Sequence, residues 1–587
     1  MARTMPHVDA VIVGMGWTGS IMARELADTN LRVVGLERGP FRDTIPDFAA
    51  PNALDELRWN SRGEMFQNLA RETVTFRNNQ TQAALPMRRL GAFLPGDGLG
   101  GAGVHWNGQH WRFLPADFVL RSHNEARYGK SFIDPDLTIQ DWGVTYDDLE
   151  PHYDKFEYVC GTSGKAGNLR GQIQAGGNPF EGPRQREYPT PPLKQGFGPR
   201  LFAEAATRLG YKPFPQPASN MSQDSYTNPD GVMIGPCTYC GFCERFGCYN
   251  WSKASPFNTV LPIALKNPNF ELRCDSHVTR VELTPDKKMA RGVTYIDATG
   301  RETFQPADLV LLCAFQLHNV RLLLVSGIGT PYEPASGQGQ VGRNFAYQTM
   351  AYIYPFFADK RMNGYAGAGG MGMIVDDYNG DNFDHAPHGF IAGGYLLGAT
   401  TGARPIQQTT LPEGSPPWGG GWKRALRDWY DRSFGIQAHG ASMARRQNHI
   451  DLDPTYRDVF GLPLARLTFD FSQNDLKMRA FLVARLNEIA RAMNPTSMKT
   501  SLPPVPFSIV PYQTTHITGG AIMGTSPSTS AVNTYLQSWD VANLFVHGAC
   551  AFPQNAGYNP TNTIAALSYR SAEALKSRYL RNPGPLM

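Results

Sequence analysis

The stretch HVDAVIVGMGWTGSIMARELADTNLRVVGLERGP, residues 7–40, decides the fold because it reads as strand, glycine turn, helix and strand. Residues 9–13 form a short, mainly apolar run rich in β-branched side chains, which suits a buried parallel strand. A second such run covers residues 31–36. The pattern predicts an α/β protein built on a doubly wound βαβ unit.

Three glycines follow the first strand at once. Gly14, Gly16 and Gly19 have G-x-G-x-x-G spacing, which allows a tight turn, lets a pyrophosphate approach the backbone, and lets the helix pack on the strand. The unpaired N–H groups that begin the helix would then face the phosphates. Glu37 ends the second strand and is placed to accept a ribose hydroxyl. These residues predict dinucleotide binding, without separating NAD from FAD.

The composition narrows the class of protein. The chain has 587 residues, a formal charge of +4 and 18% charged residues. This length favours one or two large domains with long insertions, and 60 Gly with 45 Pro indicate many turns and loops. Because no basic run or heptad stands out, nucleic-acid binding is not expected.

No segment is expected to cross a membrane. The longest apolar run, residues 309–315, is far below the roughly 18 residues that span a bilayer. Residues 1–7, before the first strand, are too short for a signal peptide. If the protein works outside the cytoplasm, we expect another protein to carry it there.

Four of the eight cysteines fall close together. Cys237, Cys240, Cys243 and Cys248 follow C-x2-C-x2-C-x4-C, which is close to a ferredoxin run with one extra residue. Spacings of two residues let thiolates of one turning loop converge on an iron–sulfur cluster. A structural zinc ion and a disulfide-linked loop are the alternatives, although four-thiolate zinc sites usually split their ligands into two distant pairs. The other cysteines are expected to be buried free thiols: Cys160, Cys274, Cys313 and Cys550.

The rest of the chain gives a coarser picture. A second glycine-rich loop begins at Gly91, and its glycines would let the backbone lie against a flat ligand. Residues 341–421 read as glycine and aromatic loops, and the strand 464–471 with the helix 474–493 reads as a sheet with one covered face. Further helices are predicted at 146–159, 197–209, 256–266 and 317–326, two strands within 270–295, and single strands at 307–314 and 448–453.

Separated motifs then occur in one order along the chain. After the N-terminal fingerprint come Gly100-Gly101-x-x-x-His105-Trp106-Asn107, LVSGIG at 324–329, VGRN at 341–344, His516-x-x-Gly519-x-x-x-Met523-Gly524 and Asn559-Pro560-Thr561-x-Thr563. Together they resemble the glucose–methanol–choline (GMC) family of FAD-dependent alcohol oxidoreductases. The cysteine-rich insertion GPCTYCGFCERFGCYNWSKASP at 235–256 is similar to that of flavoprotein subunits of bacterial membrane-associated dehydrogenases.

The resemblance implies the GMC fold. A discontinuous Rossmann-like FAD domain would be assembled from residues 1–115, 256–345 and 508–587. A substrate domain with a mixed or antiparallel sheet would use residues 116–236 and 346–507. Residues 237–255 would form a cysteine-rich iron–sulfur segment.

The resemblance also implies the site residues. His516 matches the family's catalytic base, and Asn559 matches the paired position that orients the substrate oxygen. His105 sits where some members bind the flavin 8α-methyl covalently, and noncovalent stacking is its alternative role. The residues implied to bind FAD are Gly14, Gly16, Gly19, Glu37, Gly100, Gly101, His105, Asn107, Val278, Gly548, Asn559, Pro560 and Thr561.

The activity implied is oxidation of a secondary alcohol of a sugar acid, D-gluconate at C2 giving the 2-keto acid. Alternatives are a related polyol, aldose or keto-sugar-acid dehydrogenase, an oxygen-using oxidase, and a flavin-containing lyase. The cysteines would hold a three-iron cluster, using three of the four thiolates, or a four-iron cluster. No C-x-x-C-H haem motif occurs, so the resemblance implies a membrane-anchored cytochrome c subunit as electron acceptor. It also implies a small subunit whose export signal carries this chain to the periplasmic side of the inner membrane, where it would be peripheral.

Overall fold

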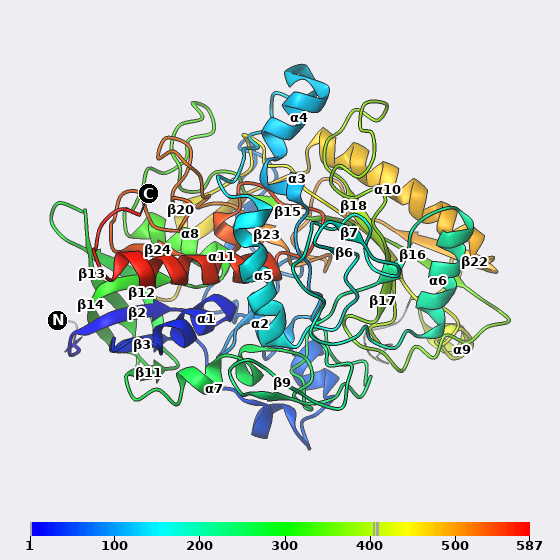
Figure 1. Cartoon of the computed structure of the whole chain (residues 1–587), viewed down its shortest axis with the longest axis horizontal. Helices are drawn as coiled ribbons and strands as arrows, with labels where there is room; N and C mark the ends of the chain where they lie inside the picture. The colour runs from blue at the N-terminus through cyan, green and yellow to red at the C-terminus, as the bar shows by residue number, and fades with distance from the viewer. Residues whose placement is uncertain (1–2, 403–405, 407–409, 587) are drawn as a thin grey trace.

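The computed structural model describes residues 3–402, 406 and 410–586. Residues 1–2, 403–405, 407–409 and 587 belong to the predicted domain ranges and lie outside the described residues. Two sheets dominate the architecture, one with α1 and α11 beside it and the other with α6 and α10 (Figure 1). Among the described residues, no helix is long and apolar enough to cross a bilayer.

The first sheet contains the predicted βαβ unit. Strand β2 (Val8–Val13), helix α1 (Trp17–Leu26) and β3 (Val33–Leu36) follow one another, and β3 lies parallel to β2. The strand order is β11-β3-β2-β14-β13-β12, and β24 (Leu544–Val546) adds to the long β14 (Glu302–Leu312). Every residue of β3 is buried, as expected for a parallel strand covered on both faces.

The glycine turn between β2 and α1 is as tight as the spacing predicts. Gly14 has φ +91°, a conformation that L side chains rarely adopt. A Cβ on Gly19 would lie 1.9 Å from the carbonyl oxygen of Gly14. Helix α1 therefore sits directly on the turn, and its first N–H groups point toward the ends of the parallel strands.

The second sheet was not expected from the sequence. It runs in the order β22-β16-β19-β18-β17-β8, and neighbouring strands are antiparallel. The prediction of loops at 341–421 is wrong, because three of these strands lie there. Each residue of β18 is buried, so its sequence has no alternation to reveal a strand. The bounds are β8 (Phe214–Pro215), β16 (Thr349–Phe356), β17 (Gly372–Val375), β18 (Gly394–Ala399), β19 (Ile436–Gly440) and β22 (Ser497–Ser501).

The interpretation of strand 464–471 and helix 474–493 as one layered unit is also wrong. Helix α10 (Gln473–Ala492) packs on β16 and β19 of the second sheet. Strand β21 (Pro463–Thr468) instead joins a separate sheet in the order β20-β21-β4-β5. The helix follows the strand in sequence but covers another sheet. The other strands of that sheet are β4 (Val74–Arg77), β5 (Leu85–Pro86) and β20 (His449–Arg457).

Most other predicted elements are confirmed, with two corrections. Helices α5 (Tyr146–Cys160), α6 (Phe197–Arg208) and α8 (Gln316–Val325) form as expected. The predicted helix 256–266 is a 3-10 turn and the single α-turn α7 (Leu261–Ala264), since Pro256 and Pro262 interrupt the backbone hydrogen bonds. The predicted strand pair 270–295 is three strands, β11 (Phe270–Arg273), β12 (His277–Leu283) and β13 (Ala290–Ile296).

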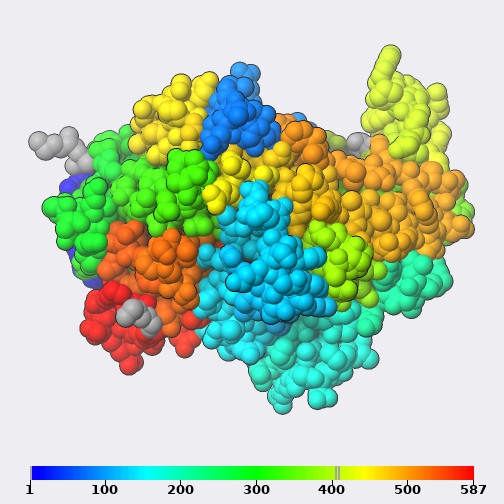
Figure 2. Space-filling model, turned by 90° about the horizontal axis from the view of Figure 1, so that it is seen from above, coloured from blue at the N-terminus to red at the C-terminus, as the bar shows by residue number. Residues whose placement is uncertain are grey.

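Two further helices complete the outline, one largely buried and one at the surface. Helix α11 (Thr561–Ala574) packs against α5 and α1 beside the first sheet (Figure 1). Seen from above, the chain around residue 420, which contains α9 (Gly419–Trp429), stands out at one edge (Figure 2).

Candidate active site

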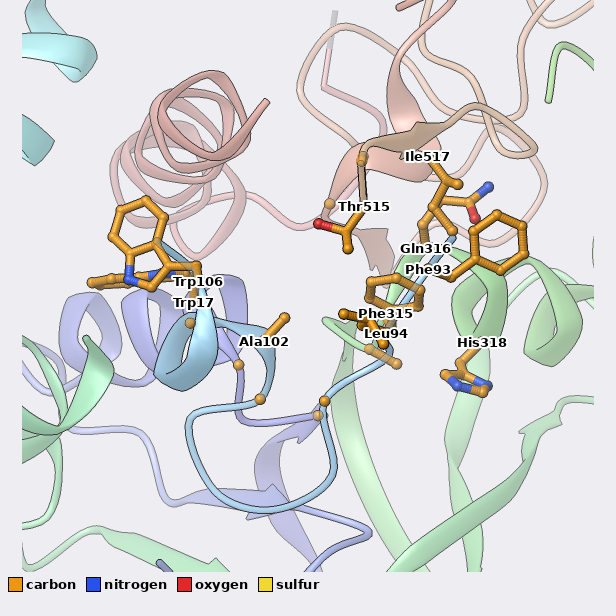
Figure 3. A pocket seen from close by; sticks show the side chains of 18 of the residues that line it. Trp17, Phe93, Leu94, Ala102, Trp106, Phe315, Gln316, His318, Thr515 and Ile517 are labelled. Carbon is orange, nitrogen blue, oxygen red and sulfur yellow. The ribbon is translucent and has the colours of Figure 1, made fainter. Parts of the chain in front are cut away.

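A large cavity encloses about 2170 Å³ of space not filled by atoms, its open mouth included. It is lined by the glycine turn, the loop before His105, the start of α8 and the segment leading to His516. Figure 3 shows Trp17 and Trp106 on one side of it, His318 on the other, and Thr515 and Ile517 from a third segment. The cavity therefore collects residues from both ends of the chain and from its middle.

One end of the cavity fits a dinucleotide. Gly14, Gly16, Glu37 and Val278 line it. Glu37 is buried, and its two oxygens accept the backbone N–H groups of Met15 and Gly39, each at 3.0 Å. Burial raises the pKa of Glu37. Each of these oxygens keeps a lone pair, so the carboxylate can still accept a hydroxyl.

The second glycine loop lies against the first glycine turn. A Cβ on Gly101 would stand 3.1 Å from Cα of Gly16, and the N–H of Gly100 donates to Met15 O at 3.0 Å. Gly19 and Gly100 do not line the cavity: Gly19 lets α1 pack on the first turn, and Gly100 joins the second loop to that turn. The other residues predicted for FAD do line it: Gly14, Gly16, Glu37, Gly101, His105, Asn107, Val278, Gly548, Asn559, Pro560 and Thr561.

His105 ends the short helix α2 (Ala102–His105) at the wall of the cavity. Its ring is buried, and its Nε2 has no hydrogen-bond partner. Burial, assisted by the charge of Lys253, lowers the pKa of His105 to about 3. The imidazole is therefore neutral, and an unpartnered nitrogen at the cavity wall fits a group that would be bound there.

A charged network near Val278 was not predicted. The carboxylate of Glu72 accepts a hydrogen bond from Arg321 Nη1 at 2.7 Å, and the same carboxylate lies 3.2 Å from His318 Nδ1. Arg38 Nη1 is 2.9 Å from His318 Nε2. Burial alone would raise the pKa of Glu72, but His318 and Arg321 hold it well below its usual value. These residues come from three distant segments, since His318 and Arg321 share α8, so no local motif indicates the network.

At the opposite end of the cavity, the two predicted catalytic residues meet. Asn559 Nδ2 donates to His516 Nε2 at 3.0 Å. The hydroxyl of Tyr395 donates to Asn559 Oδ1 at 2.8 Å, which turns the amide nitrogen toward His516. Nε2 of His516 is thus an acceptor, and it carries the lone pair that a base needs.

Gln348 acts on the other nitrogen of the same ring. Its Oε1 lies 2.5 Å from His516 Nδ1. Its Nε2 donates to the carbonyls of Ala556, Gly557 and Tyr558, at 3.2, 2.5 and 3.3 Å. Because these carbonyls fix the amide, Oε1 accepts the ring proton, and His516 is held in the tautomer protonated at Nδ1. Burial lowers the pKa of His516 to about 3, so the ring is neutral at pH 7.

The second sheet supplies the remaining wall, which sequence reasoning missed. In register across β16 and β19, Met350 lies opposite His439 and Tyr352 opposite Gln437, and all four line the cavity. His439 Nε2 is 2.9 Å from Gln437 Oε1, and its buried Nδ1 has no partner. Two polar side chains on alternate positions of one strand face the cavity and can bind hydroxyl groups of a substrate.

The four clustered cysteines line a second cavity, which encloses about 300 Å³ of space not filled by atoms, its open mouth included. Hydrogen bonds reach three of the sulfurs, from Tyr239 N to Cys237 at 3.4 Å, from Lys253 N to Cys248 at 3.4 Å and from Asn220 Nδ2 to Cys243 at 3.5 Å. Such donors stabilise thiolate ligands of a metal centre.

The spacing of these thiols separates the alternatives. Four thiolates about 2.3 Å from one zinc ion would lie within about 3.8 Å of one another. In the described part of the chain, no three cysteines have sulfurs within 4.8 Å of one another, and all eight cysteines are free thiols. The arrangement fits a multi-atom centre at the cavity better than a single ion or a disulfide-linked loop.

The cysteine segment is joined to the cavity wall at His105. Arg245 N donates to His105 O at 2.7 Å. The buried Nζ of Lys253 donates to Trp106 O at 2.6 Å and to Cys243 O at 2.6 Å. A group held by the cysteines would therefore be close to a group held at His105.

Comparison with known proteins agrees with this geometry. The GMC oxidoreductase family models match residues 146–350 and 444–568. The gluconate 2-dehydrogenase flavoprotein of Pantoea cypripedii is 51% identical, covering 100% of this chain and 96% of its own length. The fructose dehydrogenase large subunit of Gluconobacter japonicus is 26% identical, with 98% and 99% covered.

A solved structure, pyridoxine 4-oxidase from Mesorbium loti, shares the fold with a TM-score of 0.60 at 16% identity, over 97% of this chain and 99% of that one. The family models together cover more than half of the chain, and the 51% identity extends over its whole length. The chain therefore belongs to the GMC oxidoreductase family and is an FAD-dependent dehydrogenase similar to gluconate 2-dehydrogenase.

Proposed function

We propose that this enzyme oxidises a secondary alcohol of a sugar acid, D-gluconate at C2 giving 2-keto-D-gluconate, and passes the electrons on to a cytochrome c partner. The observation that carries the proposal is the full-length 51% identity to a gluconate 2-dehydrogenase flavoprotein together with the His516–Asn559 pair at the cavity. The polar side chains of Gln437 and His439 suit a polyhydroxylated substrate.

In this proposal, His516 Nε2 accepts the hydroxyl proton of the substrate, and Asn559 donates a hydrogen bond to the same oxygen. Gln348 keeps the proton of His516 on Nδ1, so that Nε2 remains unprotonated. When bound, FAD supplies the hydride acceptor. Asn559 is uncharged, so it orients the oxygen without competing for the proton.

Gly14, Gly16 and Glu37 would hold the dinucleotide, with the pyrophosphate at the start of α1. We propose that His105 carries the flavin covalently through its 8α-methyl. The buried, unpartnered Nε2 at the cavity wall supports this attachment, and a noncovalent contact with the flavin is the alternative. A covalent bond would prevent loss of the cofactor.

We further propose that Cys237, Cys240, Cys243 and Cys248 hold an iron–sulfur cluster that takes electrons singly from the reduced flavin. A three-iron cluster would use three of the thiolates and a four-iron cluster all four. The joined cavity wall at His105 supports this role, since Lys253 Nζ bridges Trp106 and Cys243. This short connection would keep the flavin and the cluster near each other.

The electrons would leave to a membrane-anchored cytochrome c subunit, and a small subunit carrying an export signal would bring the chain to the periplasmic side of the inner membrane. The relatives named as a flavoprotein of gluconate 2-dehydrogenase and a large subunit of fructose dehydrogenase support a multisubunit enzyme. Co-expression with and without such partners tests the arrangement. Stable export of this chain alone would contradict it.

A substrate panel tests the activity. Aldonates, aldoses and polyols are offered to the purified holoenzyme with an artificial electron acceptor, with and without oxygen. We expect D-gluconate to be oxidised without peroxide. Preference for an aldose or a polyol would support the related dehydrogenases, and peroxide formed at a comparable rate would support an oxidase.

Analysis of iron and sulfide after anaerobic purification, with electron paramagnetic resonance, tests the cluster. A resonance from the oxidised protein near the free-electron position indicates three irons. Silence when oxidised, followed by a resonance on reduction, indicates four. Zinc without iron would contradict the electron-relay role.

A further inference from the structure

Three permanently charged cationic side chains line the active-site cavity at described positions, and all are arginines: Arg38, Arg321 and Arg245. Arg321 is hydrogen-bonded to two carboxylates, those of Glu72 and Asp458. Arg38 also binds Glu72, at 3.4 Å. These two arginines belong to the nucleotide end, and carboxylates already balance their charges.

Arg245 lies at the other end, between His105 and the segment that leads to His516. Its backbone N–H donates to His105 O at 2.7 Å. Its guanidinium lies over the ring of Tyr512, 3.9 Å from the centroid, and Tyr512 lines the cavity four positions before His516. The cation is thus placed beside the region where the substrate would meet His516.

The guanidinium of Arg245 is poorly satisfied by the protein. Its Nη1 donates to Asn60 Oδ1 at 3.3 Å, and its buried Nε has no hydrogen-bond acceptor. The carboxylate of Glu244 stands 3.6 Å from Nε, which is an ion-pair distance but beyond a hydrogen bond. The side chain is 16% exposed. A largely buried guanidinium whose Nε–H is unused has capacity for an additional anionic acceptor.

We infer that Arg245 binds the carboxylate of the sugar-acid substrate and selects acids over uncharged sugars and polyols. This inference rests on the proposed function and identifies the residue that would recognise the class of substrate. A guanidinium presents paired N–H groups that match the two oxygens of a carboxylate. A substrate without that carboxylate would leave those donors unpaired when the site closes around it, which is a strong basis for rejection.

Glu244 would restrict the charge of the substrate that binds at Arg245. It lies beside Arg245 at the cavity and lowers the local positive charge without a hydrogen bond to it. A monoanion such as an aldonate needs one cation, and a dianion would meet repulsion from Glu244. The polyhydroxylated part of the same substrate would extend along Gln437 and His439.

The test compares D-gluconate with D-glucitol, which has the same carbon chain and no carboxylate. For the holoenzyme with an artificial acceptor, we expect Arg245→Gln to lower kcat/KM for D-gluconate by about 100-fold, mainly through KM. The kcat/KM for D-glucitol should change less than about threefold, and Arg245→Lys should restore part of the loss. Arg58→Gln, which removes a nearby charge outside the cavity, should alter neither value.

Binding gives a second measurement. In His516→Ala, D-gluconate is titrated against the flavin absorbance, and adding Arg245→Gln should raise the Kd about 100-fold. Equal losses for both substrates, or an unchanged Kd, would overturn the role of Arg245. If the wild type oxidises D-glucitol or an aldose and not D-gluconate, the proposed function itself fails, so the two failures are distinguishable.

Discussion

The side-chain oxygen of Gln348 lies 2.5 Å from Nδ1 of His516. Three backbone carbonyls hold the amide of Gln348 in this orientation. Tyr395 independently orients Asn559, whose Nδ2 faces the other ring nitrogen. The protein thus sets the proton position of His516 from both sides before a substrate arrives.

Replacing Gln348 should disturb that proton. In Gln348→Ala we expect kcat to fall about 10-fold or more with FAD still bound, because Nδ1 keeps only the Thr514 hydroxyl as a side-chain partner and the Nδ1 tautomer is less favoured. In Gln348→Glu, a carboxylate beside Nδ1 should raise the pKa of His516, so the acid limb of the kcat/KM profile moves to higher pH. Gln338→Glu on the surface is the control. A wild-type pH profile in Gln348→Glu would show that Gln348 has only a structural role.

The attachment of flavin to His105 can be seen directly. After denaturation in acid, yellow fluorescence should migrate with the wild-type chain on a gel. In His105→Ala the flavin should be released by the same treatment, although the folded variant still binds it through the glycine turn. Flavin left in the supernatant of the wild type would exclude the covalent bond.

The cysteine segment should act after flavin reduction. In Cys243→Ser we expect D-gluconate to reduce the flavin at a near-normal rate, while electron transfer to a cytochrome c acceptor falls about 10-fold or more and iron content drops. Cys274→Ser, outside the cluster, is the matched control. Because a three-iron cluster would leave one thiolate spare, the other three clustered cysteines are replaced in turn, and full activity of all four variants with the cytochrome would argue against a relay.

Acid should destabilise the fold through buried histidines. Burial lowers the pKa of His547 to about 3, and neither ring nitrogen has a partner. The unfolded chain takes up a proton near pH 6.5 that the folded chain does not bind, so stability is full above pH 6.5 and is lost as pH falls toward 3. The melting temperature of His547→Leu should fall less between pH 6.5 and 4 than that of the wild type. A parallel fall in both proteins would contradict this cause, and the exposed His7→Leu serves as control.

The sequence predicted the parts of the protein that depend on local pattern. The βαβ unit, Glu37 and helices such as α5 follow from short-range periodicity and turn chemistry. His516 and Asn559 were identified from motifs in a fixed order along the chain. Their contact at 3.0 Å depends on the tertiary structure, which the spacing of the motifs does not predict. The division into domains and the catalytic roles stay predictions.

The parts that were missed depend on long-range pairing. Strands β16 and β18 are buried along most of their length, so no alternation of buried and exposed residues marked them in the sequence. His439 faces the cavity through its register with β16, Gln348 reaches His516 from a distant segment, and neither residue carries a motif. Helix α10 packs on the second sheet through tertiary contacts, and its position after β21 in the sequence does not predict this.

The rate of anaerobic flavin reduction in His516→Ala tests the central claim, that His516 is the base in a flavin-dependent alcohol oxidation. Holoenzyme and variant are mixed rapidly with D-gluconate, and bleaching of the flavin is followed, with the exposed His388→Ala as control. The account predicts bound flavin and a reduction rate at least about 100-fold below that of the wild type. Reduction at a near-normal rate in His516→Ala would contradict it.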